Sequence, residues 1–159
     1  MHRVPARATT EQAKVILQVD HTELVNDLHT AGIPFSPKSG REQFLNLATP
    51  RLTWNFVRGV FDADGNIRVY ERYSTVKGKS YGPYGKARLT ITCGQPLLRG
   101  LRDFLQTEGL TLTPKCVTPK GVTGVLEIAN PETIKMMGEC MYEAGTLWLL
   151  RKRVVFERL

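Results

Sequence analysis

Residues 50–73 constrain the fold more than any other part of the chain, because a helical pattern passes directly into a strand pattern there. Pro50 suits the first turn of a helix, and Asp64-Gly65 ends that helix. Residues 66–73 then alternate strictly between apolar and polar side chains, as a half-buried strand does. The stretch therefore predicts an α+β fold. The apolar or small residues that recur at helical spacing before the junction are Leu52, Phe56, Gly59 or Val60, and Ala63.

A second alternating stretch, residues 86–93, follows the turn-rich residues 76–85. Together with residues 66–73 it predicts a hairpin with one apolar face and one basic, hydroxyl-bearing face. The basic face suits the major groove of duplex DNA, where Arg and Lys contact guanine edges and phosphates. Lys77 and Lys79, between the strands, are expected to reach the DNA backbone. The face that we expect to contact DNA comprises Arg68, Tyr70, Arg72, Lys86, Arg88, Thr90 and Thr92.

The remainder of the chain continues the α+β pattern. Residues 96–109 predict a helix that begins at Pro96 and ends at Gly109. Residues 110–117 and 124–129 predict two strands with a turn between them, and residues 130–145 and 146–159 predict two helices. From residue 50 the order is thus helix, two strands, helix, two strands and two helices.

The first part of the chain follows a different plan. The first ten residues are expected to be loose, residues 13–20 to form a short strand, and the next segment to form a helix capped by Thr22 and ended by Gly32. The prolines and glycine of residues 33–40 predict a loop. We therefore expect an N-terminal strand-helix extension over 1–48 and a main domain over 49–159. One apolar face of the predicted helix comprises Leu24, Val25 and Leu28.

Composition indicates which class of partner the chain binds and in which kind of compartment it resides. Lys and Arg total 22 against 15 for Asp and Glu, giving a net charge of +7 and a pI near 9.5, which favours a polyanionic partner such as nucleic acid. Three separated cysteines predict neither a disulfide framework nor a zinc site, and they favour a reducing interior, cytoplasmic or organellar. No apolar run reaches the length that spans a bilayer, so no membrane partner is expected.

The most specific motif is Val57-Arg58-Gly59-Val60-Phe61-Asp62-Ala63-Asp64-Gly65, which resembles the signature of the LAGLIDADG homing endonucleases. Arg58 is the clear departure from it. The resemblance extends over residues 50 to 159, because the order of predicted elements is also the order of the family. It implies an αββαββα unit with a saddle-shaped antiparallel sheet.

The resemblance also implies a metal-dependent nuclease site. Asp64, with the main-chain carbonyl of Ala63, is implied to bind Mg²⁺ or another divalent cation, and hard oxygen ligands suit Mg²⁺. Gln95 and Lys152 match the polar and basic residues that support catalysis in the family. Arg151 and Arg153 flank Lys152, so a shift of one residue in the comparison with the family would assign the basic catalytic role to one of these arginines instead.

A single signature implies a homodimer. Small side chains at Gly59 and Ala63 lie one helical turn apart, so a second copy of the helix can approach closely and bring two Asp64 carboxylates together. Such carboxylates repel each other unless a cation lies between them. The implied activity is a double-strand cut in a long, roughly palindromic DNA target, which serves the mobility of an intron or intein. The expected dimer interface comprises Phe56, Gly59, Val60 and Ala63.

Other interpretations were weighed against this one. A calcium loop counted from Asp62 fails, because Ile67 stands at the required glycine and Tyr73 at the required glutamate. A helix-capping turn explains Asp64 and Gly65 but leaves the small-residue stripe unexplained. The extension over 1–48 is either the remnant of a preceding unit or a source of DNA or dimer contacts. The alternatives for function are a non-cleaving nucleic-acid binder of the same fold, either a transcriptional regulator or an intron maturase, and a basic structural protein without metal.

Overall fold

The structure is a computed structural model that describes residues 6–9, 12–15, 21–31, 33, 40–142 and 148–159. The chain forms two units, Met1–Ile33 and Pro34–Leu159. The segment from Gly40 to Leu47, which the sequence assigned to the extension, is part of the larger unit. Within it, the Phe44 ring lies 5.6 Å from that of Phe56 and 5.5 Å from that of Phe104, measured between ring centroids.

The smaller unit holds a hairpin and one helix. Strands β1 (Ala6–Thr9) and β2 (Gln12–Val15) pair antiparallel, so the expectation of a loose segment was wrong for residues 6–9; residues 1–5 and 10 lie outside the described residues. The predicted strand over 13–20 is described only as far as β2, and its remainder lies outside the described residues. The sequence named the wrong cap for α1 (Thr22–Thr30), because the Nδ1 atom of His21 accepts the N–H of Leu24 at 3.1 Å. Gly32, the predicted terminator, also lies outside the described residues.

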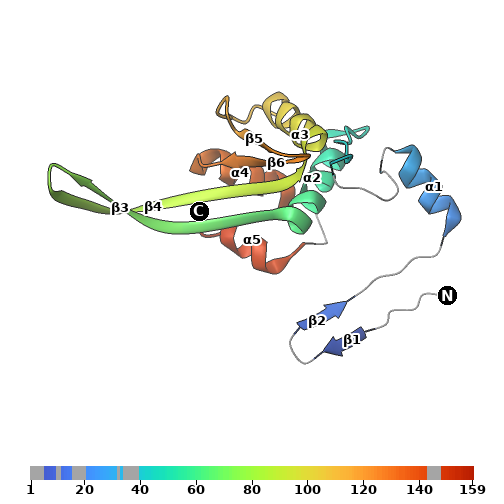
Figure 1. The fold of residues 1–159 in the computed structure, drawn as a ribbon, viewed down its shortest axis with the longest axis horizontal. Helices are drawn as coiled ribbons and strands as arrows, with labels where there is room; N and C mark the ends of the chain where they lie inside the picture. Colours follow the sequence, from blue (N-terminus) through green and yellow to red (C-terminus); the bar gives the residue numbers. More distant parts are fainter. Residues whose placement is uncertain (1–5, 10–11, 16–20, 32, 34–39, 143–147) are drawn as a thin grey trace. The chain divides into compact units, whose positions relative to one another are not determined.

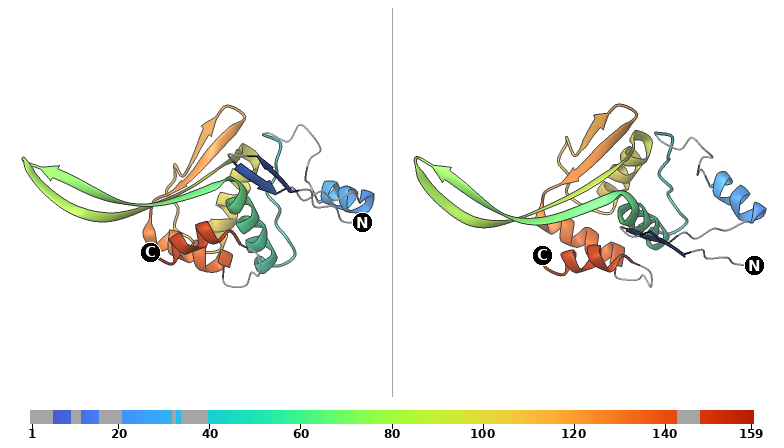
Figure 2. Two further views of the ribbon diagram at one scale, coloured as in Figure 1. Left: turned by 90° about the horizontal axis from the view of Figure 1, so that it is seen from below. Right: turned by 60° about the horizontal axis from the view of Figure 1, so that its bottom comes forward.

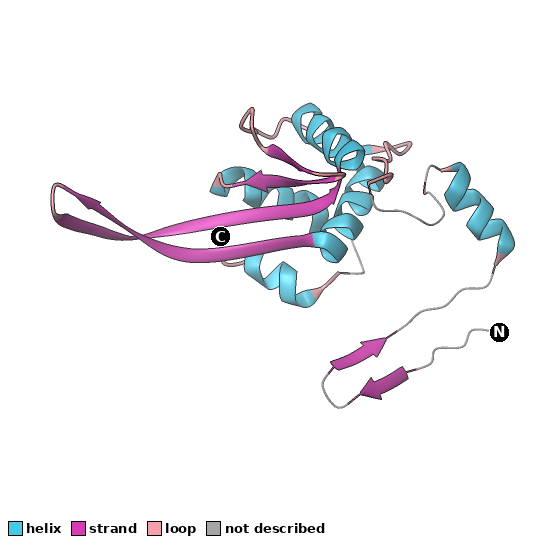
Figure 3. Ribbon diagram, in the orientation of Figure 1, coloured by secondary structure: helices cyan, strands magenta, loops and turns pink. Residues whose placement is uncertain are grey.

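The larger unit confirms the predicted order of elements and the α+β class (Figure 1, Figure 3). Four antiparallel strands form one sheet in the order β3-β4-β6-β5, so β3 and β5 are its edges. The elements are α2 (Pro50–Asp64), β3 (Gly65–Val76), β4 (Lys79–Gly94), α3 (Gln95–Thr107), β5 (Val117–Lys120), β6 (Thr123–Ile128), α4 (Pro131–Tyr142) and α5 (Leu150–Phe156).

The hairpin of β3 and β4 is longer than predicted. Residues 76–85 were expected to form a turn, but only Lys77 and Gly78 do so, with φ values of 49° and 76°. A two-residue turn with positive φ matches the right-handed twist of the strands that it joins. The rest of the stretch pairs across the hairpin, with one irregularity between Arg72 and Ser74. The two strands thus continue beyond the helices as an arm, which we define as residues 72–85 (Figure 1, Figure 2).

The predicted strand over 110–117 was also wrong for most of its length. Strand β5 begins only at Val117, and the turn before it is closed by a hydrogen bond from the N–H of Cys116 to the carbonyl of Thr113 at 3.0 Å. The carbonyl of Thr111 accepts the hydroxyl of Thr133 on α4 at 3.1 Å, which ties this part of the loop to the helix. The expected turn over 118–121 is likewise mostly strand, and Gly121 takes the positive φ that its tight turn needs.

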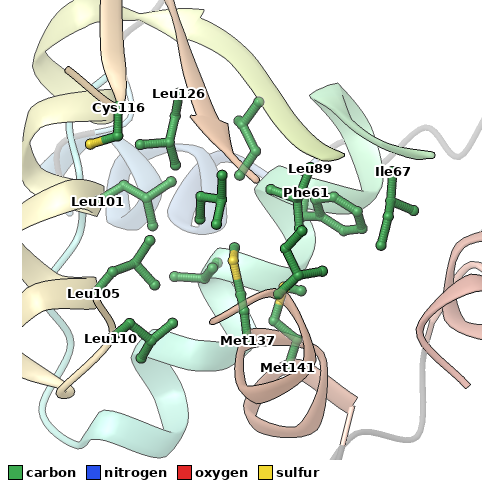
Figure 4. Close-up of a cluster of buried hydrophobic side chains, with 14 of the residues drawn as sticks. Phe61, Ile67, Leu89, Leu101, Leu105, Leu110, Cys116, Leu126, Met137 and Met141 are labelled. Atoms are coloured by element: carbon green, nitrogen blue, oxygen red, sulfur yellow. The ribbon is translucent and has the colours of Figure 1, made fainter. Parts of the chain in front are cut away.

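The core lies between the apolar face of the sheet and helices α2, α3 and α4 (Figure 4). Residues recurring at helical spacing on α3 are buried as predicted, including Leu98, Leu101 and Leu105. Helix α2 buries a different stripe from the one that the sequence singled out, because Val57 and Phe61 face the core. Residues Leu52, Gly59 and Ala63 are exposed and Phe56 and Val60 partly so, and thus α2 presents the predicted interface stripe outward.

Candidate active site and nucleic-acid interface

Helix α2 delivers Asp64 to the surface at its last turn. The Asp64 side chain is exposed, and Gly65 caps the helix by donating its N–H to the carbonyl of Phe61. A Cβ atom on Gly65 would lie 2.2 Å from the Phe61 ring, so only glycine allows the strand to leave the helix at this point. The Asp-Gly pair of the motif therefore has a steric reason here, namely close packing of Gly65 on a buried aromatic ring.

Lys152 lies buried beneath this turn. Its Nζ atom donates to the carbonyls of Asp62 at 2.9 Å and Gly65 at 2.6 Å, and also to the carbonyl of Phe61. It also lies 4.7 Å from the centroid of the Phe61 ring. A cation at the C-terminus of a helix opposes the helix dipole and satisfies carbonyls that have no partner within the helix. The three N–H groups of Lys152 thus fix the backbone on both sides of Asp64.

Burial lowers the pKa of Lys152, and the positive charge of Arg151 lowers it further, whereas the negative charges of Asp62 and Asp64 oppose both effects. The neighbouring basic residues lie elsewhere. Arg151 is exposed, and Arg153 lies 4.2 Å from the ring centroid of Trp148 and pairs with Glu157 at 3.1 Å. Of the three residues between which the sequence left a choice, Lys152 is the one that contacts the end of α2.

Asp62 holds the site together, a role that the sequence did not predict. Its carboxylate accepts the Tyr142 hydroxyl at 2.9 Å and the Leu149 N–H at 3.2 Å. It therefore joins the end of α2 to α4 and to the residues before α5, which carries Lys152. Burial raises the pKa of Tyr142, and the hydrogen bond to Asp62 and its charge raise it further. No spacing pattern distinguishes this aspartate from Asp64, because the distinction depends on which helices pack around α2.

Gln95 begins α3, as the sequence placed it, and its amide is engaged. The Nε2 atom donates to the carbonyl of Gly121 at 2.6 Å, and the Oε1 atom accepts from Arg99 at 3.0 Å. The side chain is thereby tied to the β5–β6 turn and to its own helix. A supporting role for Gln95 in catalysis stays a prediction.

Cys93, near the end of β4, is influenced by two carboxylates, those of Asp64 and Glu42. Burial raises the pKa of its thiol to about 12, and the charges of Asp64 and Glu42 add to the effect. The Glu42 carboxylate accepts the Gly40 N–H at 2.9 Å, and its Oε2 atom lies 2.2 Å from where a Cβ on Gly94 would stand. Glu42 therefore packs on the bare backbone at Gly94. Glu42 precedes α2 and belongs to no motif, so no sequence pattern identifies it.

The basic strand face forms as predicted at its paired positions. In the hairpin register Arg68 lies opposite Arg88, and Tyr70 lies opposite Lys86, so these side chains share one face. Their side chains are exposed, whereas Ile67 and Leu89 on the other face are buried. Arg88 also pairs with Glu127 on β6 at 3.5 Å. Of the other predicted DNA contacts, Thr90 is half-buried, Thr92, Lys77 and Lys79 are exposed, and Arg72 lies on β3 opposite Tyr84.

The oxygen donors at the end of α2 are the Asp64 carboxylate and the neighbouring main-chain carbonyl of Ala63. Within the described part of the chain, no group of three or more His, Cys, Asp or Glu side chains could hold a metal ion. Asp64 and the carbonyl of Ala63 are oxygen ligands of the kind that Mg²⁺ accepts, and Mg²⁺ commonly keeps several waters. A symmetric pair of chains would double this oxygen set.

No family model matches the chain, and no curated protein matches it. Among solved structures, it is similar to the homing endonuclease I-CvuI in complex with its target in the presence of Ca, with a TM-score of 0.48 and 16% identity over 68% of this chain. It is also similar to the LAGLIDADG homing endonuclease I-SmaMI bound to cleaved DNA, with a TM-score of 0.49 and 21% identity over 70% of this chain. For the homing endonuclease I-TnaI the TM-score is 0.46, with 17% identity over 66% of this chain.

The match spans 63% of the I-CvuI chain, 35% of the I-SmaMI chain and 67% of the I-TnaI chain. By the order and pairing of its own elements, the fold of this protein is LAGLIDADG-like. A separate finding concerns membranes: none of the helices in the described ranges has the length and apolar character needed to cross one.

Proposed function

We propose that the chain is one subunit of a site-specific, metal-dependent endonuclease that binds duplex DNA and cuts both strands as a homodimer. The observation that carries the proposal is the end of α2. There an exposed Asp64 stands on a turn held by the buried ammonium of Lys152, while Gly59 and Ala63 of the same helix are exposed. A solvent-accessible carboxylate on a backbone fixed from beneath is a suitable ligand for a catalytic cation.

The dimer brings two such ends together. A Cβ on Gly59 would meet nothing within 4 Å, and Ala63 one turn later is exposed, so another helix can approach along this stripe. Phe56 and Val60 flank the stripe and are half-buried, which leaves apolar surface for a partner helix to cover. An isologous contact about a twofold axis places both Asp64 side chains at one end of the crossing. The dimer would carry a formal charge of 7 + 7 = +14, which favours a polyanion.

The residues at the end of α2 and around it have different roles in this proposal. Asp64 and the Ala63 carbonyl would hold the divalent cation, which neutralises charge on the phosphate and supplies a more acidic water. Lys152 is a positioning residue in this scheme, because all three of its N–H groups are taken by backbone carbonyls. Asp62 keeps the helix that carries Lys152 in place through Tyr142 and Leu149.

The DNA would lie along the basic strand face. Arg68, Arg88 and Lys86 present exposed cations on one side of a twisted two-stranded ribbon, and such a ribbon fits a major groove about 12 Å wide. Because two copies related by a twofold axis read two half-sites, the expected target is long and roughly palindromic. Lys77 and Lys79, at the far end of the arm, would contact the outer part of each half-site.

The test compares the wild type with Asp64→Asn on a pool of randomised palindromic duplexes with Mg²⁺, with sequencing of the cut ends. We expect the wild type to cut and Asp64→Asn to lose at least about 100-fold in rate, while binding measured by fluorescence anisotropy is kept. Asp103→Asn is the matched control, because it removes the same charge from an exposed position on α3. Equal cutting by the wild type and Asp64→Asn would contradict the assignment.

The second candidate is a nucleic-acid binder of the same fold that does not cut. It is favoured by the observation that one chain, within its described residues, supplies no cluster of three metal-ligating side chains. Binding of duplex DNA or structured RNA by the wild type, with no cut ends under any divalent cation and no effect of Asp64→Asn on affinity, would select this alternative.

A further inference from the structure

A hollow beside the edge strand β3 is lined by residues of β3, β4 and α5 and by Arg158, which follows α5. The hollow measures about 650 Å³. It is lined on the strand side by Ile67, Arg68, Val69, Tyr70 and Arg88, and on the helix side by Val155 and Arg158. Arg68 and Arg88 are opposite each other in the hairpin register, whereas Arg158 comes from the end of the chain. Arg68, Arg88 and Arg158 therefore line one hollow, although Arg158 is far from the other two in the sequence.

The position of Arg158 is set by the packing of α5. Phe156 places its ring 5.6 Å from Phe61 and 5.6 Å from Tyr142, and a Cβ on Gly138 would lie 2.4 Å from that ring. The chain then turns back, because the Arg158 N–H donates to the carbonyl of Val155 at 3.3 Å. Arg158 is thus held by a fixed helix end next to β3.

The charged side chains that line the hollow are all cationic. Among the described residues that line it there is no carboxylate, and the guanidinium groups present several planar N–H donors. Glu127 pairs with Arg88 at 3.5 Å, but both side chains are about half exposed, and such a pair contributes little. Like charges brought together in this way favour a ligand with two or more negatively charged oxygens, as a phosphate has.

We infer that this hollow grips a backbone phosphate of the bound duplex, with Arg158 as a contact supplied by the last helix. The inference rests on the proposed function, and it adds a site that the strand face alone does not provide. Paired strands lie about 4.8 Å apart, so a ribbon seated in a groove about 12 Å wide has its edge strand beside the groove wall, where phosphates lie. Strand β3 is that edge, so Arg158 flanks the groove instead of entering it.

The experiment measures binding of a mixed-sequence duplex by fluorescence anisotropy over a range of salt concentrations, without Mg²⁺ so that no cutting occurs. No target sequence is needed, because phosphate contacts do not depend on sequence. We expect Arg158→Gln to lower the slope of log K against log salt by about 0.9 and to weaken binding about 5- to 10-fold near 0.1 M salt. A thermal melt is expected to be unchanged, because the side chain is exposed.

Arg102→Gln is the matched control. It removes the same charge from α3, whose apolar side chains pack on the sheet face opposite to the basic strand face, and we expect a slope equal to that of the wild type. The double variant Arg68→Gln/Arg158→Gln tests the convergence. If both side chains grip one phosphate, the combined loss of affinity is smaller than the product of the separate losses.

The outcomes separate the two claims. If the wild type binds no duplex at any salt concentration, the proposed function fails and this inference fails with it. If the wild type binds and Arg158→Gln behaves like Arg102→Gln, only this inference is overturned. Independent, fully multiplicative losses in the double variant would also overturn it, because they would place the two arginines on different phosphates.

Discussion

The two halves of the β3–β4 hairpin have the same strand pattern and different surroundings. In the half beside the helices, Leu89 and Ile91 are fully buried under α2, α3 and α4. In the arm, Val76 and Tyr81 remain 55% and 46% exposed although they lie on the same two strands. Alternation therefore decides which face a side chain occupies, and the presence of a covering helix decides whether that face is buried.

The covered half of the hairpin and the arm are therefore suited to different roles. The covered half has a hydrophobic core to hold it, so it can carry the exposed Asp64 at a fixed position beside β3. The arm is stabilised by pairing across the hairpin and by the turn at Lys77 and Gly78, and an isolated two-stranded ribbon is marginal in water. An arm of this kind suits a surface that a bound partner completes.

The largest expected effect comes from breaking the covered half. Leu89→Ala removes a fully buried side chain from the centre of the core and should lower the free energy of unfolding by about 2–5 kcal/mol. Val76→Ala in the arm should change it by less than about 0.5 kcal/mol. Urea denaturation followed by circular dichroism measures both, and equal losses would mean that the arm is part of the core.

A smaller effect is expected where the covered half meets the active site. Lys152→Met leaves the carbonyls of Phe61, Asp62 and Gly65 without their donor in a buried place, at a cost of about 1–3 kcal/mol. Lys79→Met is the matched change in the arm, where the side chain is exposed, and it should leave the unfolding free energy within about 0.5 kcal/mol of the wild type. A Lys152→Met protein as stable as Lys79→Met would show that the three hydrogen bonds do not hold the end of α2.

The smallest expected effect is the pH dependence of stability that comes from the Cys93 thiol. The raised pKa of Cys93 means that the folded protein keeps this thiol protonated above pH 9, where an unfolded chain has begun to lose the proton. Its contribution to stability is therefore complete below pH 9 and is lost as the pH rises toward about 12.

Maleimide labelling followed by peptide mapping measures the difference. At pH 8 we expect Cys93 to react slowly, whereas the cysteine introduced by Ser80→Cys at an exposed position of the arm should react like a free thiol. Asp64→Asn should speed the labelling of Cys93, because it removes one of the charges that raise the pKa. Equal rates at Cys93 and at position 80 in the otherwise unchanged protein would contradict the burial of the Cys93 thiol.

The sequence predicted the features that depend on local periodicity. The helix from Pro50 to Asp64, the strand that follows it and the buried stripe of α3 all came from spacing, because helices and strands repeat every 3.6 and 2 residues. The same reasoning failed for residues 76–85 and 110–116. Glycines and a proline made the first of these resemble a loop although it pairs as strand, and alternation made the second resemble a strand although Thr133 holds it as a loop.

The candidate site was predictable in part. Asp64 and Lys152 were named from the motif and from the family order, and the structure places the Lys152 ammonium on the carbonyls on both sides of Asp64. Asp62 was missed because its partners are 80 residues and more away in the sequence. Glu42 was missed because it belongs to no motif. No local pattern records a contact made by packing.

The amino-acid sequence by itself determined the order of elements in the main domain and the sign of the charge along the hairpin, since each follows from residues close together in the chain. Only the tertiary structure decided which stripe of α2 faces outward, which of three adjacent basic residues supports it, and that Arg158 joins Arg68 and Arg88 in one hollow. The first fact depends on how α2 packs on the core, and the other two depend on where α5 packs. Both positions are set by buried contacts among segments that the sequence separates.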